Sequence, residues 1–584
     1  MKQRFSNLKH SPQKSRSFFG TLVGAIESKR PSDRLILRVL FFTCLGGLIM
    51  AGIVWSNSTS TLTPSSGGTI KEGVIGIPRF VNPALAVTRA DLDISALVYS
   101  GLMKISPDGT LIPDIAESVT VSDDGKTYNV LIKKSLRFHD GTPLTARDVA
   151  YTIGLIQDGD LKSPLRGNWA DVTLEEIGEY ELNIVLKQAY APFIENFTVG
   201  ILPKHIWSTL PIEQIPFSLK NTEPVGSGPF MIDTIARNDA GLIKVYNLKK
   251  FTDNYPVKLD AVEMHFYQNE DELIEAFTNK EITSTTQLPI ENGLALKENG
   301  DYRLITEPLP RVFAVFFNQN RTPVLRDTAV RLALTTVIDR DILVDTALYG
   351  FGVPIKGPVP SNHPAVESSS QSIGSTASSS PLETAKSILM RAGWIKNNTS
   401  GWEKRIDGET RTLAITLKTA NTPAFEATTE IIARSWRELG VDVTIEQFEQ
   451  SDLLQAVIRP RDFESLLFGL DMNRAVDLFP FWHSSQREDP GLNIAQYANI
   501  EVDTLLEKAR SASSTEVQIA ATKDAIQILG RETPAAFLYV PDLVYVLQSN
   551  IKTPAMDRLS KPQERFMNIG DWNMNTDKLW PLFK

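Results

Sequence analysis

The spacing of hydrophobic residues divides the chain into one long apolar run near its N-terminus and a body in which strand-like and helix-like patterns alternate. Val39–Trp55 contains no charged residue. Alternation with a period of two over residues 119–138, around a turn rich in Asp and Gly, predicts a β-hairpin. Residues 413–448 predict a strand, a helix that ends at Gly440, and a second strand. The pattern therefore predicts an α/β body that follows an apolar segment.

The stretch Leu136–Val149 predicts the end of a strand, a tight turn and the start of a helix. Asp140-Gly141 suits a turn because glycine accepts a positive φ angle. Thr145 and Asp148 have the spacing of a capping box, with Asp in place of the usual Glu, and an apolar run follows them. By itself, this pattern describes an ordinary strand-to-helix corner.

The apolar run has the length and the flanking charges of a membrane anchor. Residues 35–55 are long enough to cross a hydrocarbon core of roughly 30 Å. Residues 1–38 carry nine Lys or Arg against two acidic residues, which gives this segment a net charge of +7. The positive-inside rule then predicts a basic cytoplasmic segment 1–34, a transmembrane helix 35–55 and a flexible linker 56–68.

The apolar run could instead be a lipoprotein signal or a cleaved signal peptide. A lipoprotein signal needs a cysteine just after the apolar core, whereas Cys44 lies in its middle. A cleaved signal peptide usually has a short basic region and a small-residue cleavage site, and neither is evident here. The sequence therefore favours an uncleaved single-pass anchor in the cell membrane, with the C-terminal body outside the cytoplasm.

Charge and motifs restrict the classes of function that the body can have. The 584-residue chain has a net charge of −9, so the part after Arg38 sums to −16, which argues against a nucleic-acid partner. The single cysteine excludes disulfides within the body and a cysteine-based zinc site. We find neither a nucleophile elbow nor an H-E-x-x-H helix. The six histidines are scattered without ligand spacing, so no metal or cofactor is expected from local motifs, and a metal site built from distant residues stays open. Together with the resemblance described next, the missing motifs predict a protein that is not an enzyme.

Several ordered motifs resemble those of a known family. They are the corner at 136–149, F-V-N-P-A-L at 80–85, L-I-P-D-I-A-E-S at 111–118, P-V-G-S-G-P-F at 224–230 and D-L-F-P-F-W-H-S-S at 477–485. Together they resemble the extracytoplasmic solute-binding proteins of ABC importers, in the dipeptide, oligopeptide and nickel-binding family (family 5). The resemblance runs from about residue 69 to residue 584. It departs from the family pattern at Leu478, where proline is usual.

The resemblance implies a two-lobed periplasmic-binding-protein fold of the α/β class with an extra small subdomain. Lobe I is expected to comprise 69–308 and 550–584, with the subdomain at about 115–220. Lobe II is expected at 309–549, interrupted by a low-complexity insertion at 367–381.

The resemblance also implies where a ligand binds. In peptide-binding members of the family, an Asp in the region of 471–485 binds the α-ammonium group of the ligand, and aromatic residues wall the pocket. Asp471, at the end of an apolar strand, is the first candidate, because ligands meet open α/β sheets at strand ends. Asp477 is its competitor and is alternatively a structural cap for the aromatic loop. The remaining candidate ligand-binding residues are Trp482, His483, Arg311 and Asn318.

The function implied is capture of a peptide-like solute between two hinged lobes and its delivery to ABC permease subunits in the membrane. We expect a monomer whose closure is a population shift toward a state that binds the solute better. Two alternatives stay open. One is a nickel-chelate-binding or sugar-binding member of the same fold, and the other is a stand-alone peptide sensor or chaperone without a transport role.

Overall fold

A computed structural model describes most of the chain. The described residues are 30–59, 61–289, 292, 294, 300–361, 363–366, 380–397, 401–472, 474–512 and 514–579. The predicted basic segment lies outside them up to residue 29, and the predicted insertion lies outside them from 367 to 379. The chain forms two compact units, one of residues 1–65 with 576–584 and one of residues 66–575.

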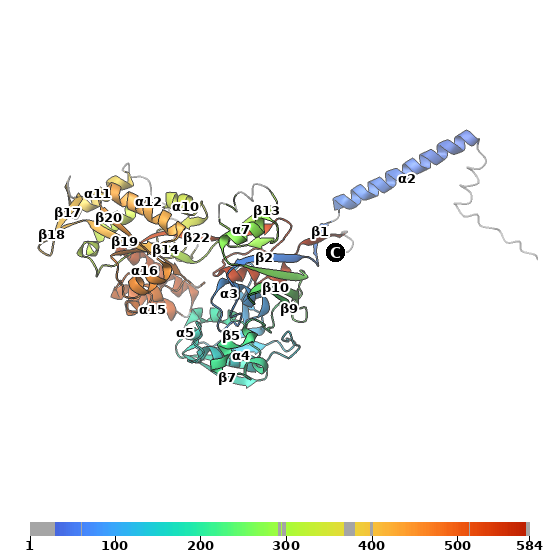
Figure 1. The fold of residues 1–584 in the computed structure, drawn as a ribbon, viewed down its shortest axis with the longest axis horizontal. Coiled ribbons are helices and arrows are strands. Elements are labelled where there is room, and N and C mark those ends of the chain that lie inside the picture. The colour runs from blue at the N-terminus through green and yellow to red at the C-terminus, as the bar shows by residue number, and fades with distance from the viewer. Residues whose placement is uncertain are drawn as a thin grey trace, which may run out of the picture. The chain divides into compact units, whose positions relative to one another are not determined.

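Among its described residues, the first unit contains one long helix and a two-stranded sheet. Helix α2 spans Pro31–Thr59 and includes the apolar run (Figure 1). Strand β1 (Thr61–Ser65) pairs with β23 (Asn575–Leu579), so part of the predicted linker is a strand. Within the described residues, no helix combines the length and the apolar character needed to cross a membrane. The transmembrane anchor therefore stays a prediction.

The second unit is built on one continuous mixed sheet. Its strand order is β20 (Asp442–Phe448), β19 (Ala414–Ala420), β21 (Ser465–Asp471), β14 (Arg311–Phe317), β22 (Ala535–Gln548), β12 (Ser284–Thr285), β2 (Thr69–Ile75), β11 (Ala261–Tyr267), β10 (Ile243–Lys250) and β9 (Phe230–Arg237). Two further strands, β13 (Tyr302–Pro308) and β15 (Gly352–Pro354), also pair with β22. We call the part on the β2 side of β22 lobe I and the part on the β14 side lobe II.

Strand β22 belongs to both lobes, because it changes its neighbours along its length. Its first half pairs with β14 and β15, and from Asp542 onward it pairs with β13. At this change of partners, the Leu309 N–H donates to the Pro541 carbonyl at 3.2 Å. The chain thus crosses between the lobes at Leu309–Pro310 and again at Pro541–Asp542. The second crossing comes earlier in the sequence than the boundary predicted at 549/550. The domain limits themselves stay a prediction.

The hydrophobic cores follow the same division. One large core runs through lobe I and draws on Leu309 and Leu543 at its edge. Two cores cover the two faces of the lobe II sheet, and both begin after residue 311 and end by Val540. Because burial of apolar area is the main favourable term in folding, each lobe is held together by its own core. The two lobes are joined by strands.

Lobe I carries the small subdomain around a four-stranded antiparallel sheet, seen beside α4 in Figure 1. Its strand order is β5 (Ala116–Val121), β6 (Thr127–Ile132), β8 (Glu181–Leu186) and β7 (Val172–Gly178). The predicted hairpin over 119–138 is confirmed by the pairing of β5 with β6. The other elements of lobe I are α3 (Arg89–Val98), β3 (Met103–Ile105), β4 (Leu111–Pro113), α4 (Ala146–Gln157), α5 (Arg166–Trp169), η1 (Ala191–Thr198), α6 (Lys204–Trp207), η2 (Ile212–Phe217), η3 (Leu219–Asn221), α7 (Glu270–Thr278), η7 (Pro562–Phe566) and η8 (Ile569–Asp571).

The corner at 136–149 has the predicted structure. Gly141 has a φ angle of 87°, and α4 starts directly after Thr145. The Asp148 carboxylate accepts a hydrogen bond from the Thr145 main-chain N–H at 2.9 Å, which is the return half of the capping box. His139 lies in the turn: its Nε2 is 3.0 Å from the Gly228 carbonyl. This corner therefore fixes the subdomain to the strand that returns to lobe I.

Lobe II contains the predicted strand-helix-strand unit. Strands β19 and β20 are parallel, α12 (Pro423–Leu439) connects them, and Gly440 follows the helix with a φ angle of 101°. Strand β21, which carries Asp471, lies between β19 and β14. The other elements of lobe II are η4 (Pro323–Arg326), α9 (Thr328–Thr336), α10 (Arg340–Ala347), α11 (Pro381–Arg391), β16 (Ile395–Asn397), β17 (Gly401–Ile406), β18 (Glu409–Thr412), α13 (Gln450–Asp452), η5 (Leu453–Ile458), α14 (Phe479–Trp482), η6 (Ser484–Gln486), α15 (Ile500–Arg510) and α16 (Thr515–Glu532).

Candidate functional site

A cleft of about 590 Å³ lies where the subdomain of lobe I faces the loop after β21 of lobe II. Lobe I contributes the region around η1 and the segment that leads into η7, and lobe II contributes the loop after β21 and the end of α15. The polar and charged side chains that define the cleft are Tyr190, Glu195, Arg474, Arg510, Lys561 and Glu564. Clefts between lobes are the usual place for a small-molecule site in proteins of this architecture.

Arg474 crosses the cleft from lobe II to lobe I. Its Nη2 lies 2.5 Å from Glu564 Oε2 and donates to Ser560 Oγ at 3.2 Å. Its Nη1 donates to the Gly109 carbonyl at 3.1 Å and also to the Arg558 carbonyl. The Arg474 side chain is only 15 % exposed, so these contacts shield it from most of the solvent. A single side chain therefore joins the loop after β21 to four positions in lobe I.

A second bridge between the lobes is centred on Asp477. Its Oδ2 accepts hydrogen bonds from Tyr190 Oη of lobe I at 3.2 Å and from Arg510 Nε at 2.8 Å. The Arg510 guanidinium also lies over the rings of Phe479, at 4.0 Å, and Tyr190, at 5.1 Å. Burial and the neighbouring carboxylate raise the pKa of Tyr190, so its hydroxyl stays a donor at neutral pH.

Glu195 is the carboxyl group in the cleft that is closest to titrating near neutral pH. Its Oε2 accepts a hydrogen bond from the Arg474 main-chain N–H at 3.2 Å. Burial raises the pKa of Glu195 to about 7, because the attraction of Arg474 offsets only part of the loss of solvent. The lobe I side of the cleft thus holds a carboxyl group that gains or loses its proton in the physiological range.

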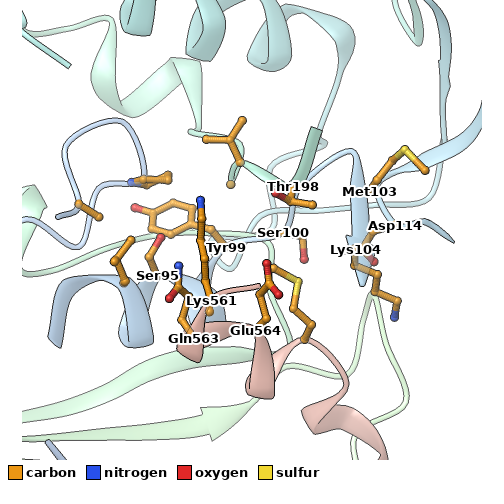
Figure 2. Close-up of a pocket in the computed structure, with 18 of the residues that line it drawn as sticks. Ser95, Tyr99, Ser100, Met103, Lys104, Asp114, Thr198, Lys561, Gln563 and Glu564 are labelled. Carbon is orange, nitrogen blue, oxygen red and sulfur yellow. The ribbon is translucent and has the colours of Figure 1, made fainter. Parts of the chain in front are cut away.

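The cleft continues into a smaller cavity of about 180 Å³ inside lobe I (Figure 2). We call it the lobe I cavity. The two spaces share wall residues, namely Asn168, Glu195, Asn196, Thr198, Lys561 and Glu564. The inner part of the cavity is lined by Ser95, Tyr99, Ser100, Lys104 and Asp114. Burial raises the pKa of the Asp114 carboxyl, and Lys104 and Tyr255 partly oppose that shift.

None of the six residues predicted to bind ligand is among the described residues that line the cleft, although Asp471, Asp477, Trp482 and His483 lie within three positions of the lining residues Arg474 and Pro480. The structure brings two of them together, because Arg311 and Asp471 face each other across β14 and β21. Arg311 Nη2 lies 3.2 Å from Asp471 Oδ2, and both side chains are partly exposed, at 41 % and 59 %. This pair lies beside the crossing at Leu309–Pro310, since the Met472 N–H donates to the Pro310 carbonyl at 2.8 Å.

Asp477 has the geometry of a structural cap for the aromatic loop, which was the alternative to its role in binding ligand. Its Oδ1 accepts a hydrogen bond from the Phe479 N–H at 3.0 Å, at the start of α14. Its side chain is 7 % exposed. Because every one of these donors belongs to the protein, Asp477 has little capacity left for a ligand ammonium group.

Trp482, His483 and Asn318 are buried in lobe II. Trp482 is fully buried, and its ring packs against those of Phe537 and Tyr497. The His483 ring stacks on a neighbouring aromatic ring. Asn318 is 2 % exposed and donates to the Arg461 carbonyl at 3.0 Å. Their roles in binding stay predictions, and their contacts in the structure are those of core residues.

The residues that form the cleft carried little signal in the sequence. Arg474 is separated from Glu195 by 279 positions and from Glu564 by 90, and no local pattern links positions so far apart. Tyr190, Arg510 and Lys561 lie at element ends in segments without a distinctive motif. The sequence indicated the region of Arg474 but not its role. Arg474 lies in the loop after the apolar strand that ends at Asp471. Within the described residues, no group of three or more His, Cys, Asp or Glu is placed to hold a metal ion.

The architecture and the cleft define a two-lobed binding protein of the α/β class. A family model described as "Bacterial extracellular solute-binding proteins, family 5 Middle" matches residues 110–488. The chain therefore belongs to this family of extracytoplasmic solute-binding proteins of ABC importers, which confirms the resemblance seen in the sequence.

Particular relatives are similar over most of their length. The chain is 27 % identical to the oligopeptide-binding protein AppA of Bacillus subtilis, over 93 % of this chain and 99 % of that protein. A solved structure of that protein in complex with a nonapeptide has a TM-score of 0.66 and 26 % identity, and the match covers 87 % of this chain and 99 % of that one. The nickel-binding periplasmic protein of Escherichia coli is 26 % identical, over 64 % of this chain and 70 % of that protein.

Proposed function

We propose that this protein captures a peptide-like solute in the cleft between its lobes and delivers it to the permease of an ABC importer. The observation that carries the proposal is the cleft of about 590 Å³, which is walled by both lobes and crossed by side chains of Arg474 and Tyr190. The similarity to an oligopeptide-binding protein over almost its full length supports a peptide as the solute.

The mechanism that we propose is closure around two strand crossings. Leu309–Pro310 and Pro541–Asp542 are the covalent connections between the lobes, and each lobe has its own core. Rotation at these crossings changes few buried contacts inside either lobe. A solute that binds to both walls has differential affinity for the closed state and shifts the population toward it.

We assign the ammonium group of the solute to Asp471, which does not line the cleft itself but lies three residues before Arg474, which does. A buried ammonium needs a compensating carboxylate, and Asp471 lies at the end of β21, beside a crossing. Its present partner is Arg311, and an exposed ion pair of this kind is worth only about 0–1 kcal/mol. Asp471 can therefore exchange Arg311 for a ligand group at little cost, whereas Asp477 is already bound on several sides.

The test compares Asp471→Asn with Asp477→Asn, using free and N-acetylated forms of the same peptides. Asp471→Asn should weaken binding of the free peptide by roughly two to four powers of ten and scarcely alter binding of the acetylated one. Asp477→Asn should mainly lower the melting temperature. Unchanged affinity of Asp471→Asn for the free peptide would refute this assignment. A wild-type thermal shift with a nickel-histidine complex and none with peptides would favour the nickel-chelate alternative.

We also propose that the protein is held at the cell membrane by its N-terminal segment. The support is in the sequence: the uncharged run Val39–Trp55 and the excess of basic residues before it. The intact protein should remain with membranes after alkaline extraction. Leu48→Lys, which places a charge in the apolar run, should release a larger fraction into the supernatant. A mature N-terminus shortly after Trp55 would contradict the anchor.

A further inference from the structure

Lys561 is the one cationic side chain on the shared wall of the cleft and the lobe I cavity. It precedes η7, and Figure 2 shows its side chain running away from that segment toward the other lining residues. The residue is exposed to solvent. Within the described part of the chain, its ammonium group has neither an ion-pair partner nor a hydrogen-bond partner.

The other basic residues that line these two spaces have partners in the protein. Arg474 pairs with Glu564, and Arg510 pairs with Asp477. Lys187 lies 3.9 Å from Asp171, and the Lys104 ammonium lies over the Tyr255 ring, 5.8 Å from its centroid. Among the described residues that line the two spaces, Lys561 is therefore the cation without a partner in the protein.

Three acids also line the cavity, and each is offset in its own way. Glu564 is paired with Arg474, and burial raises the pKa of Asp114. Burial raises the pKa of Glu195 to about 7, so it repels an anion less than a fully ionised carboxylate does. Ser95, Ser100 and Thr198 add hydroxyl donors to the cavity wall. The buried Tyr99 hydroxyl, on a side chain that is 4 % exposed, lacks a hydrogen-bond partner among the described residues. An ammonium group surrounded by hydroxyl donors is a typical receptor for a carboxylate.

We infer that the lobe I cavity receives a carboxylate of the solute and that Lys561 is the residue that binds it. This inference rests on the proposed function and sharpens it, because it restricts the solute to molecules with a carboxylate that reaches beyond the cleft. In a peptide, that group is either the C-terminal carboxylate or an acidic side chain. The cavity of about 180 Å³ has room for an end group of this kind.

The experiment measures binding of two matched sets of short peptides, one with free C-termini and one with C-terminal amides, together with small carboxylic acids and their amides. The variants are Lys561→Met, which keeps the length and the apolar stem, and Lys249→Met as the control. Lys249 is an exposed lysine of lobe I that lines neither the cleft nor the lobe I cavity, and it pairs with Asp233 at 2.9 Å. Melting temperatures of both variants establish that they fold.

Lys561→Met should lose about 10- to 100-fold in affinity for the carboxylate ligand and change little toward its amide. Lys249→Met should stay within about 2-fold for both. Loss on C-terminal amidation assigns the cavity to the C-terminus, and loss only on Glu→Gln replacement within the peptide assigns it to an acidic side chain.

Each other result has its own meaning. Equal binding of acids and amides by the wild type overturns the carboxylate subsite and leaves peptide capture intact. Binding of small carboxylates without binding of peptides keeps the subsite and overturns the peptide assignment. Binding of neither set overturns both.

Discussion

Two arginines organise charge clusters in this protein, one inside lobe I and one across the cleft. Arg565 donates to both oxygens of Asp93 at 2.8 and 2.7 Å and to Glu72 at 2.8 Å, and all three side chains are fully buried. Burial lowers the pKa of Arg565, but the two carboxylates outweigh burial and raise it overall. Arg474 has a similar set of acceptors, but they belong to the opposite lobe, and the Arg474 side chain keeps 15 % exposure.

The two clusters differ in the partners that their carboxylates keep when the arginine is removed. Removal of Arg565 leaves one cation, Arg89, for two carboxylates that have no access to water: Asp93 keeps Arg89 at 3.0 Å, and Glu72 keeps hydrogen bonds from the Ser284 and Tyr545 hydroxyls. When Arg474 leaves, Glu564 keeps hydrogen bonds from the Ser560 N–H at 2.7 Å and from the Ser560 hydroxyl at 2.6 Å. The first cluster therefore belongs to the folding of a lobe, and the second is built so that it can separate. The comparison teaches that an arginine pair between lobes can be reversible if its acid has local donors.

The largest effect is expected for Arg565→Leu. Loss of this cation leaves two fully buried carboxylates with only Arg89 to balance their charge, so the free energy of unfolding should fall by about 3–5 kcal/mol. Urea unfolding monitored by circular dichroism measures this loss. The matched variant Arg474→Leu, in the same assay, should lose much less. Equal losses for the two variants would show that the two clusters do not differ in the way described.

A pH-dependent effect of intermediate size is expected for Glu195. Its pKa is about 7 in the folded protein and 4.5 ordinarily. As pH rises from 4.5 to 7, the unfolded chain releases this proton while the folded chain keeps it, so the fold loses stability across that window. The Glu195→Gln variant lacks this loss. The difference in unfolding free energy should thus move in favour of the variant by up to about 3 kcal/mol between pH 4.5 and 7.

For Arg474→Leu, stability should change by only about 1–2 kcal/mol, because several charge-assisted hydrogen bonds are lost but Glu564 stays paired. The principal change should be in the separation of the lobes. Small-angle scattering without solute should give a larger radius of gyration for Arg474→Leu than for the wild type. An unchanged radius, with an unchanged affinity for solute, would mean that Arg474 does not hold the lobes together.

The smallest effect is expected for Tyr190→Phe. This substitution removes one hydrogen bond to Asp477 and leaves Arg510 bound to the same carboxylate. The loss should be about 1 kcal/mol. Combining Tyr190→Phe with Arg474→Leu tests whether the two bridges act together, since a double-mutant cycle isolates their coupling. Strict additivity of the two changes would mean that each bridge opens independently.

Much of the local structure could be predicted because its signals are local. The capping residues Thr145 and Asp148 are three positions apart, and the hairpin over 119–138 depends on a turn and an alternation that lie within one short segment. Strand β22 gave no comparable signal. Pro541 interrupts its apolar run, and proline inside a strand usually indicates an edge. Here Pro541 is tolerated because it lies where β22 changes partners, and its carbonyl accepts from Leu309.

The candidate site was much less predictable from the sequence. The expected residues Asp471 and Asp477 were found through the apolar strand and the aromatic loop around them, and the structure places both near the lobe boundary. Glu195 and Arg474 meet only after both lobes have folded, and Lys561 joins the lining of the same cleft from a distant part of lobe I. The role of each charged residue in binding depends on which other residues it contacts. Contacts between residues hundreds of positions apart cannot be predicted from local spacing or composition.

The sharing of β22 by both lobes also has a consequence for biosynthesis. The strand spans residues 535–548 of a 584-residue chain, and it supplies neighbours to β14 in one lobe and to β13 in the other. A nascent chain that ends before Ala535 lacks the central strand of both halves of the sheet. Neither lobe can complete its native hydrogen-bond ladder until residues 535–548 have been synthesised, so both lobes wait for the same segment before they reach their final tertiary structure.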